Sequence, residues 1–285
     1  MIRPITVGVD NSTGSRTAGE WAAREAVRRR LPLHLVHVWL DEPTFMAPPP
    51  DRAEAERLLG EIAADVAARH PGLEVTSEVV SGSPVARLIE RGDEAELLVL
   101  GSRGHTAFVG FLLGSVSLPV TAHTARPVVV VCEDTSGEPE AGGEIVVGLK
   151  DLGPSADALL GPAFTMASAR GAAVRAVGVY SLPSVFGRDA ADLLRQQGFN
   201  EEEDRVGRAL SEALAPWRPQ FPRVRVVEHL RFGNAAEELL AAASEAGLLI
   251  IGRRVARPAL GLRIGPVAQS VLHHSPAPVM IIPYD

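Results

Sequence analysis

The sequence contains almost no cysteine. Cys132 is the only one among 285 residues, so no disulfide can form within the chain, and this suits a reducing compartment. The N-terminal stretch MIRPITVGVDNS enters a strand-like alternation at once, without the charged and then apolar segments of a secretion signal. No apolar run approaches the roughly 18–20 residues of a membrane-spanning helix. We therefore expect a cytoplasmic protein without a membrane partner.

Basic charge is also scarce. Lys and Arg number 28 against 35 Asp and Glu, which gives a net charge of −7. This balance argues against a protein whose main task is to coat nucleic acid or an anionic membrane. Hydrophobic residues make up 46% of the chain and charged residues 22%, as in folded globular proteins. We expect no nucleic-acid partner.

The familiar catalytic motifs are missing. The sequence has no Gly-x4-Gly-Lys-(Ser/Thr) phosphate loop and no Gly-x-Ser-x-Gly nucleophile elbow. Its His, Cys, Asp and Glu residues do not recur at the spacing of metal ligands. We therefore predict no catalytic residues and no metal site.

What the sequence does contain is an internal repeat. The segment GSPVARLIERGDEAELLVLGSRG resembles the later segment GNAAEELLAAASEAGLLIIGRRV. Five matching pairs of residues are each separated by 151 positions: Gly82 and Gly233, Gly101 and Gly252, Gly114 and Gly265, His123 and His274, and Pro127 and Pro278. Near the front, Gly8 and Gly148 are separated by 140, which indicates an insertion of eleven residues in the second copy. The chain therefore holds two copies of one domain.

The stretch EDTSGEPEAGGE, rich in Gly, Glu, Pro and Ser, separates the copies and is typical of a linker. We place an N-terminal domain at residues 1–135 and a C-terminal domain at 144–285. Each is large enough for a core of its own.

Short apolar runs such as ITVGV, LHLVHVW, LLVLG and PVVVV alternate with helical patterns in each copy. Strands that are apolar on both faces and alternate with helices indicate a parallel sheet covered by helices on each side. We predict an α/β protein made of two tandem doubly wound parallel-sheet domains. Such sheets bind ligands at the carboxyl ends of strands, where the strand order reverses.

A glycine-rich segment, GSRGHTAFVGFLLGSVS, directly follows the apolar run ELLVL. It places Gly101, Gly104 and Gly114 in the spacing Gly-x2-Gly-x9-Gly, followed by Ser115 and an amphipathic helix. Glycine lets a ligand approach the backbone closely, and a helix N-terminus offers free N–H donors to an anion. Ser115 and Ser117 add hydroxyl groups, although Ser115 can also cap the helix. The segment predicts a phosphate cradle; the alternative is a flexible surface loop.

These residues resemble the universal stress protein family, whose pattern Gly-x2-Gly-x9-Gly-(Ser/Thr) is matched at every position. The opening VGVDNS and the closing HTARPVVVV are similar to family features, and both halves share the resemblance, as in a tandem member. The resemblance implies a Rossmann-like fold of the adenine-nucleotide α-hydrolase type. It also implies ATP as the cofactor, with or without Mg²⁺.

In ATP-binding members the glycine loop and its serine wrap the phosphates. The aspartate that ends the first strand, and the residue after the second-strand histidine, hold the nucleoside. Carried over by position, the expected cofactor-binding residues are Asp10, Val38, Gly101, Arg103, Gly104, Gly114, Ser115, Val116 and Ser117. Two alternatives stay open: Asp10 can instead cap the following helix, and Val38 can simply pack in the core.

The second copy departs from the pattern. Val255 stands where the first copy has Gly104, and Pro266, which has no N–H, stands where it has Ser115. Asp10 is matched by Lys150, although a shift of one residue would bring Asp151 into its place. We expect a degenerate nucleotide motif in the C-terminal domain, which would serve assembly or bind something else.

The favoured interpretation is an ATP-binding universal stress protein that acts as a nucleotide-responsive stress regulator, through a regulatory protein partner. ATP hydrolysis, if any, should be slow and incidental, because the glycine loop has no lysine. The apolar final strands would be open edges in a single domain, so we expect them to pair with each other or across a homodimer. The alternatives are a non-nucleotide scaffold and a nucleotide α-hydrolase-like enzyme.

Overall fold

The computed structural model describes residues 2–40, 51–102, 105–106, 110–111, 114–132, 143–180, 188–255 and 264–285. Of the expected site residues, Arg103 and Gly104 lie outside the described residues.

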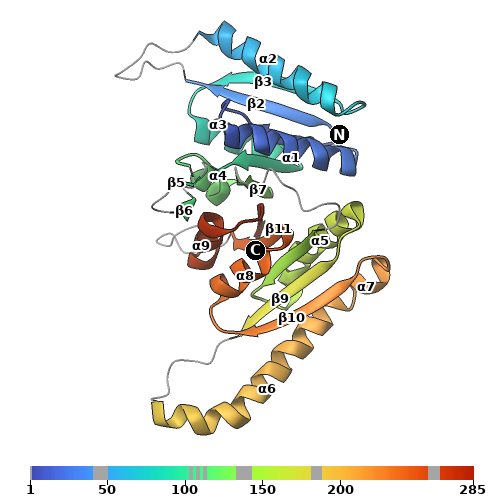
Figure 1. The fold of residues 1–285 in the computed structure, drawn as a ribbon, viewed down its shortest axis with the longest axis vertical. Coiled ribbons are helices and arrows are strands. Elements are labelled where there is room, and N and C mark those ends of the chain that lie inside the picture. The colour runs from blue at the N-terminus through green and yellow to red at the C-terminus, as the bar shows by residue number, and fades with distance from the viewer. Residues whose placement is uncertain are drawn as a thin grey trace.

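Both halves are α/β, as the sequence predicted, and they stand one above the other in Figure 1. The elements of the N-terminal half are β1 (Ile5–Gly8), α1 (Thr13–Arg29), β2 (Leu33–Trp39), α2 (Arg52–Arg69), β3 (Val75–Ser81), α3 (Pro84–Glu94), β4 (Leu97–Gly101), β5 (His105–Thr106), β6 (Gly110–Phe111), α4 (Ser117–His123) and β7 (Val128–Val131). Those of the C-terminal half are β8 (Glu144–Leu149), a 3₁₀ turn (Pro154–Ala156), α5 (Asp157–Arg170), β9 (Val174–Tyr180), α6 (Arg188–Leu214), α7 (Trp217–Gln220), β10 (Val226–Phe232), α8 (Ala235–Ala243), β11 (Ala246–Arg254), α9 (Pro266–His274) and β12 (Val279–Tyr284).

Ten strands form one continuous sheet in the order β10-β9-β8-β11-β12-β7-β4-β1-β2-β3. Among the described residues of this ten-stranded sheet, neighbouring strands are parallel within each half, and only the β12–β7 pair, where the halves meet, is antiparallel. The short strands β5 and β6 form a separate antiparallel pair. The apolar runs lie inside, as in Leu97–Leu100, all of them at most 3% exposed. The prediction of doubly wound parallel sheets is therefore confirmed.

The final strands of the two halves pair with each other. Val128, Val129 and Val130 lie opposite Ile281, Met280 and Val279. Since each of these N-terminal residues corresponds to the residue 151 positions later, the register is symmetric about the Val129–Met280 pair. The edges that would be open in a single domain are thus closed within one chain.

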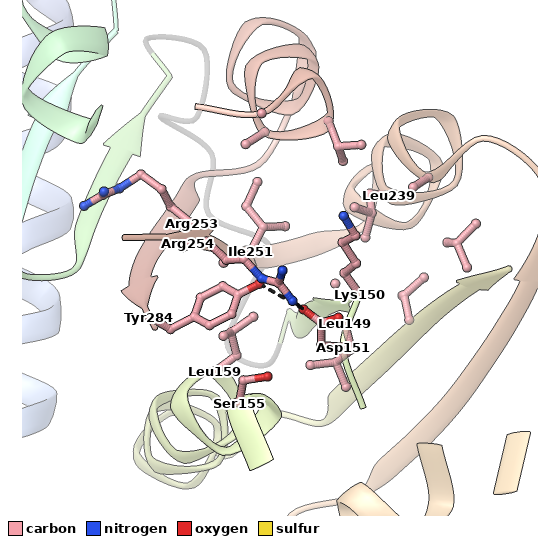
Figure 2. Close-up of a pocket in the computed structure, with 18 of the residues that line it drawn as sticks. Leu149, Lys150, Asp151, Ser155, Leu159, Leu239, Ile251, Arg253, Arg254 and Tyr284 are labelled. Atoms are coloured by element: carbon pink, nitrogen blue, oxygen red, sulfur yellow. Dashed lines mark hydrogen bonds and ion pairs between the residues drawn. The ribbon is translucent and has the colours of Figure 1, made fainter. Parts of the chain in front are cut away.

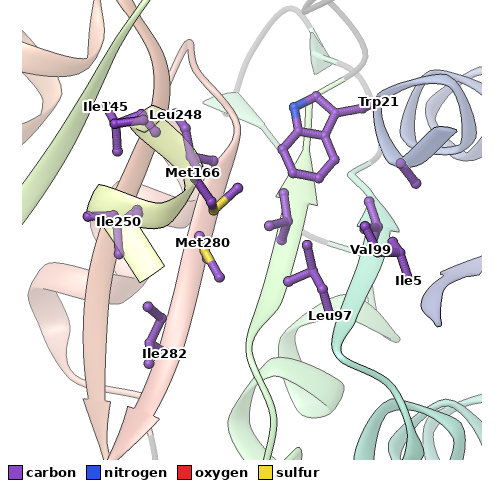
Figure 3. Packing of buried hydrophobic residues seen from close by; sticks show 14 of the residues in the cluster. Ile5, Trp21, Leu97, Val99, Ile145, Met166, Leu248, Ile250, Met280 and Ile282 are labelled. Atoms are coloured by element: carbon purple, nitrogen blue, oxygen red, sulfur yellow. The ribbon is translucent and has the colours of Figure 1, made fainter. Parts of the chain in front are cut away.

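Each face of the sheet carries one hydrophobic core that runs through both halves. One contains residues of α1, α2, α5 and α6, and the other contains residues of α3, α4, α8 and α9. Figure 3 shows the first core at the junction, where Met166 and Met280 of the C-terminal half lie near Trp21 and Leu97 of the N-terminal half. The halves are therefore packed as one body.

Polar contacts also cross the junction. Arg170 at the end of α5 donates to the carboxylate of Glu25 in α1 (Nη2–Oε2 2.8 Å), and its guanidinium lies 5.3 Å from the centre of the Trp21 ring. The Glu25 side chain is fully buried and that of Arg170 is 8% exposed. Arg253 of β11 donates to the Thr124 carbonyl (2.5 Å).

Helix α1 begins unusually close to the end of β4. A Cβ on Gly101 would lie 2.5 Å from the backbone of Gly14, and a Cβ on Gly14 would lie 2.3 Å from the Ser102 carbonyl oxygen. No side chain fits at either position without a backbone shift. Gly101, which we expected to leave room for a ligand, leaves room for the first turn of α1.

In the part of the chain that the structure describes, no helix has both the length and the apolar character to cross a membrane.

Replacing Arg170 by Met should destabilise the chain by about 3–5 kcal/mol, because the buried Glu25 carboxylate loses its nearest cation. Urea unfolding measures the loss. The double variant Glu25→Leu/Arg170→Met should recover most of it. If the single and double variants lose the same stability, this ion pair contributes nothing to the junction.

Gly101→Ala should cost about 1–3 kcal/mol or more, because the new methyl group collides with backbone atoms that cannot rotate away. Gly19→Ala, in α1 with nothing within 4 Å of its added Cβ, is the control and should be neutral or stabilising by up to about 1 kcal/mol. Equal thermal midpoints for the two variants would contradict the close approach of α1 and β4.

Candidate functional site

Each half contains one place where the strand order reverses. In the N-terminal half the chain continues from β1 to β2 on one side, and β4 lies on the other side of β1. In the C-terminal half β8 lies in the same way between β9 and β11. A crevice at the carboxyl ends of such strands is the usual ligand site of open α/β sheets. The two candidate sites are therefore the ends of β1 and β4, and the ends of β8 and β11.

Asp10 lies just beyond β1, at the first of these places, and is exposed. Its Oδ1 accepts hydrogen bonds from the backbone N–H of Ser12 (3.1 Å) and from the Ser12 hydroxyl (2.6 Å). Ser12 is the residue that caps α1, by accepting from the Ser15 N–H (3.2 Å). The alternative of Asp10 as the helix cap is therefore wrong. Asp10 instead orients the cap and keeps an exposed carboxylate at the strand end.

The end of β2 lies beside that carboxylate. The His37 ring lies 2.7 Å, through Nδ1, from the Val9 carbonyl and so ties β2 to the residue that precedes Asp10. Val38 is half-buried and packs against the second core. The alternative in which Val38 packs in the core is therefore confirmed, and a backbone contact with a ligand stays a prediction.

The segment that follows the glycine loop returns to the end of β4. The hydroxyl of Ser117, 5% exposed, donates to the Gly101 carbonyl (3.1 Å). Gly114 and Val116 are half-buried, and Ser115 is exposed. The Ser117 hydroxyl is thus hydrogen-bonded to the backbone of β4, whereas the side chain of Ser115 is exposed to solvent.

The C-terminal half holds a cavity of about 340 Å³ at the equivalent place (Figure 2). We call it the second-half cavity. Register shows which residues correspond: Gly8 lies opposite Val36 in the first half, and Gly148 lies opposite Val177 in the second. Lys150 therefore matches Asp10 and no shift occurs. Similarly, Val7 lies opposite Val99, and Val147 lies opposite Ile250, so Gly252 matches Gly101.

Among the residues that line the second-half cavity are Lys150, Val179, Gly252 and residues 265–268. These match, in the first half, Asp10, Val38, Gly101 and residues 114–117. The positions predicted from the glycine pattern thus surround one cavity in the half where the pattern is altered.

The mouth of this cavity carries a polar cluster (Figure 2). The Asp151 carboxylate accepts from the Arg254 guanidinium (Nη2–Oδ2 2.5 Å) and, more weakly, from the Tyr284 hydroxyl (3.4 Å). The hydrogen bond from Arg254 to Asp151 raises the pKa of Arg254 above its usual value, so the guanidinium stays charged. Arg254 lies 151 positions after Arg103, one of the expected site residues, so the repeat points to it; Tyr284 was not predicted. A Cβ on Gly252 would lie 2.4 Å from the Tyr284 ring.

Comparison with known proteins agrees with this architecture. The model of the universal stress protein family matches residues 1–131 and again 143–283. A universal stress protein of Mycolicibacterium smegmatis is 31% identical over 98% of this chain and 96% of its own length. One of Mycobacterium tuberculosis is 29% identical over 97% of this chain and 96% of that protein.

Solved structures give the same result for the fold. A universal stress protein from Archaeoglobus fulgidus covers 98% of each chain with a TM-score of 0.68 at 21% identity. Two shorter structures were solved with a nucleotide. A universal stress protein in complex with dAMP covers 46% of this chain at 26% identity, with a TM-score of 0.36. One in complex with cAMP covers 47% of this chain at 28% identity, with a TM-score of 0.38. Likeness at those scores carries no argument about the site. With the family model matched twice along its length, this chain belongs to the universal stress protein family and carries two tandem domains of that family.

Proposed function

We propose that this chain binds an adenine nucleotide, ATP, at the carboxyl ends of β1 and β4, and that it acts as a nucleotide-responsive stress regulator. The observation that carries the proposal is the second-half cavity. Its lining includes the matches of eight of the nine residues expected at the first site, among them Arg254, the match of Arg103. The same fold around the less altered pattern of the N-terminal half supports a ligand cleft there.

The described residues supply complementary chemistry for a nucleotide. Asp10 offers an exposed carboxylate that can accept from ribose or adenine donors. Gly114 and Ser115 lie before α4, and the Ser117–Gly101 hydrogen bond keeps this segment at the end of β4. Phosphate groups placed beside Ser115 would meet glycine backbone and a hydroxyl donor. Mg²⁺, where present, would accompany the triphosphate.

A regulator needs no fast chemistry. The glycine loop GSRGHTAFVGFLLG contains no lysine that could stabilise the charge developing on the phosphates during transfer. We therefore expect hydrolysis to be slow and incidental. A homodimer, which we also propose, must use surfaces other than β7 and β12, because these strands already pair within the chain. Regulation would then operate through a protein partner that distinguishes the nucleotide-bound and nucleotide-free chains.

Calorimetric titration with ATP tests the proposal. Ser115→Glu should weaken binding at least tenfold, because a carboxylate then faces the phosphates at an exposed position that the fold does not depend on. Asp10→Asn should weaken it about ten- to hundredfold through the loss of a charged acceptor.

The matched control is Ser155→Glu, which places the same charge at the second-half cavity and should leave ATP affinity unchanged. A wild-type chain that does not bind ATP would leave the scaffold alternative standing. Equal affinities for wild type and Ser115→Glu would move the nucleotide away from the first site.

A further inference from the structure

The second-half cavity differs in chemistry from a nucleotide cleft. Its walls are apolar: Leu149, Val177, Leu239 and Ile251 line it and are each at most 5% exposed. Its volume of about 340 Å³ lies at the lower end of the range for small-molecule pockets, about 300–1,000 Å³. The interior therefore suits a small ligand with an apolar body.

The mouth of the cavity carries an excess of positive charge. Lys150, the only lysine of the whole sequence, is exposed and takes part in none of the ion pairs formed among the described residues. Arg254 is already paired with Asp151. The exposed ammonium group of Lys150 thus lies at the edge of an apolar interior, next to the Arg254–Asp151 ion pair, whose charges cancel.

Carboxylate acceptors, by contrast, are reduced to Asp151 among the residues that line the cavity. Its Oδ2 accepts from both Arg254 and Tyr284, and the acceptor present at Asp10 in the first half is replaced by Lys150. A nucleoside brings amino and hydroxyl donors, and a buried donor without an acceptor costs about 1–3 kcal/mol. Pro266 also removes an N–H where the first half has Ser115. The cavity discriminates against a nucleotide and favours a ligand with few donors.

We propose that the second-half cavity binds a small amphipathic anion, with its apolar body inside and its single head group, a carboxylate or a phosphate, against Lys150. The site is separate from the nucleotide site and does not rest on it. The charge of Lys150 positions the head group. The apolar walls stabilise the bound body, since each buried CH₂ contributes about 0.8 kcal/mol to the binding free energy.

Calorimetry with octanoate, octyl phosphate and octanol tests the class of ligand. Octanoate, octyl phosphate or both should bind at one per chain, and octanol, with the same body and no charge, at least tenfold more weakly. Acetate, with the head group alone, should not bind detectably. The two anionic probes tell a carboxylate preference from a phosphate preference.

Two variants locate the binding. Lys150→Gln should weaken octanoate about tenfold, whereas Arg223→Gln should not weaken it; this control removes an equal charge just before β10, at the opposite ends of the strands. Val179→Phe should fill the cavity and abolish octanoate binding while ATP binding persists. Val38→Phe, the matched change in the first half, should affect ATP and leave octanoate unchanged. Retained ATP binding shows that Val179→Phe has folded.

The single lysine also gives a readout that reports on one position. Acetylation of Lys150 by an amine-reactive ester, followed by peptide mass spectrometry, should slow severalfold in octanoate, while the amino-terminal amine reacts at its usual rate. Equal binding of octanol and octanoate, no effect of Lys150→Gln, or displacement of octanoate by ATP from this cavity would each overturn the proposal. Failure of ATP to bind at the first site would overturn only the nucleotide proposal.

Discussion

The antiparallel pairing of β7 and β12 is the constraint on which the rest of the molecule depends. It joins two parallel half-sheets into one sheet and lets each hydrophobic core continue from one half into the other. The symmetric register about Val129 and Met280 places the two strand-order reversals at equal distances from the joint. Because β7 and β12 are antiparallel, the strands of the two halves run in opposite directions, and the two crevices lie at opposite ends of the strands. At about 4.8 Å between strands, the crevices are also offset by about 19 Å across the sheet. One small ligand cannot occupy both, so the crevices are free to differ.

They differ at matched positions. In the first half Gly101 receives the first turn of α1, while in the second half Gly252 receives the ring of Tyr284. Asp10 presents a carboxylate where Lys150 presents an ammonium group. The framework is therefore shared, and the chemistry at the strand ends is not. A duplicated domain can in this way keep one site for a nucleotide and adapt the other to a ligand of a different class.

The repeat and its offsets were enough to predict two doubly wound domains, because apolar runs and glycines recur at fixed spacing. The match of Lys150 with Asp10 was also predictable and is confirmed by strand register. The Glu25–Arg170 pair and the Arg253–Thr124 contact were not, because each needs the placement of one half against the other. Whether the second half keeps a cavity was left open, because substitutions in a motif indicate which donors are lost, but not whether the remaining walls still enclose a space.

Native mass spectrometry of the whole chain with ATP and octanoate together tests the central claim, that the two crevices of one chain take different ligands. The account predicts a complex of one chain with one ATP and one octanoate, in which neither ligand displaces the other. Two ATP molecules per chain, or ATP and octanoate that exclude each other, would contradict it.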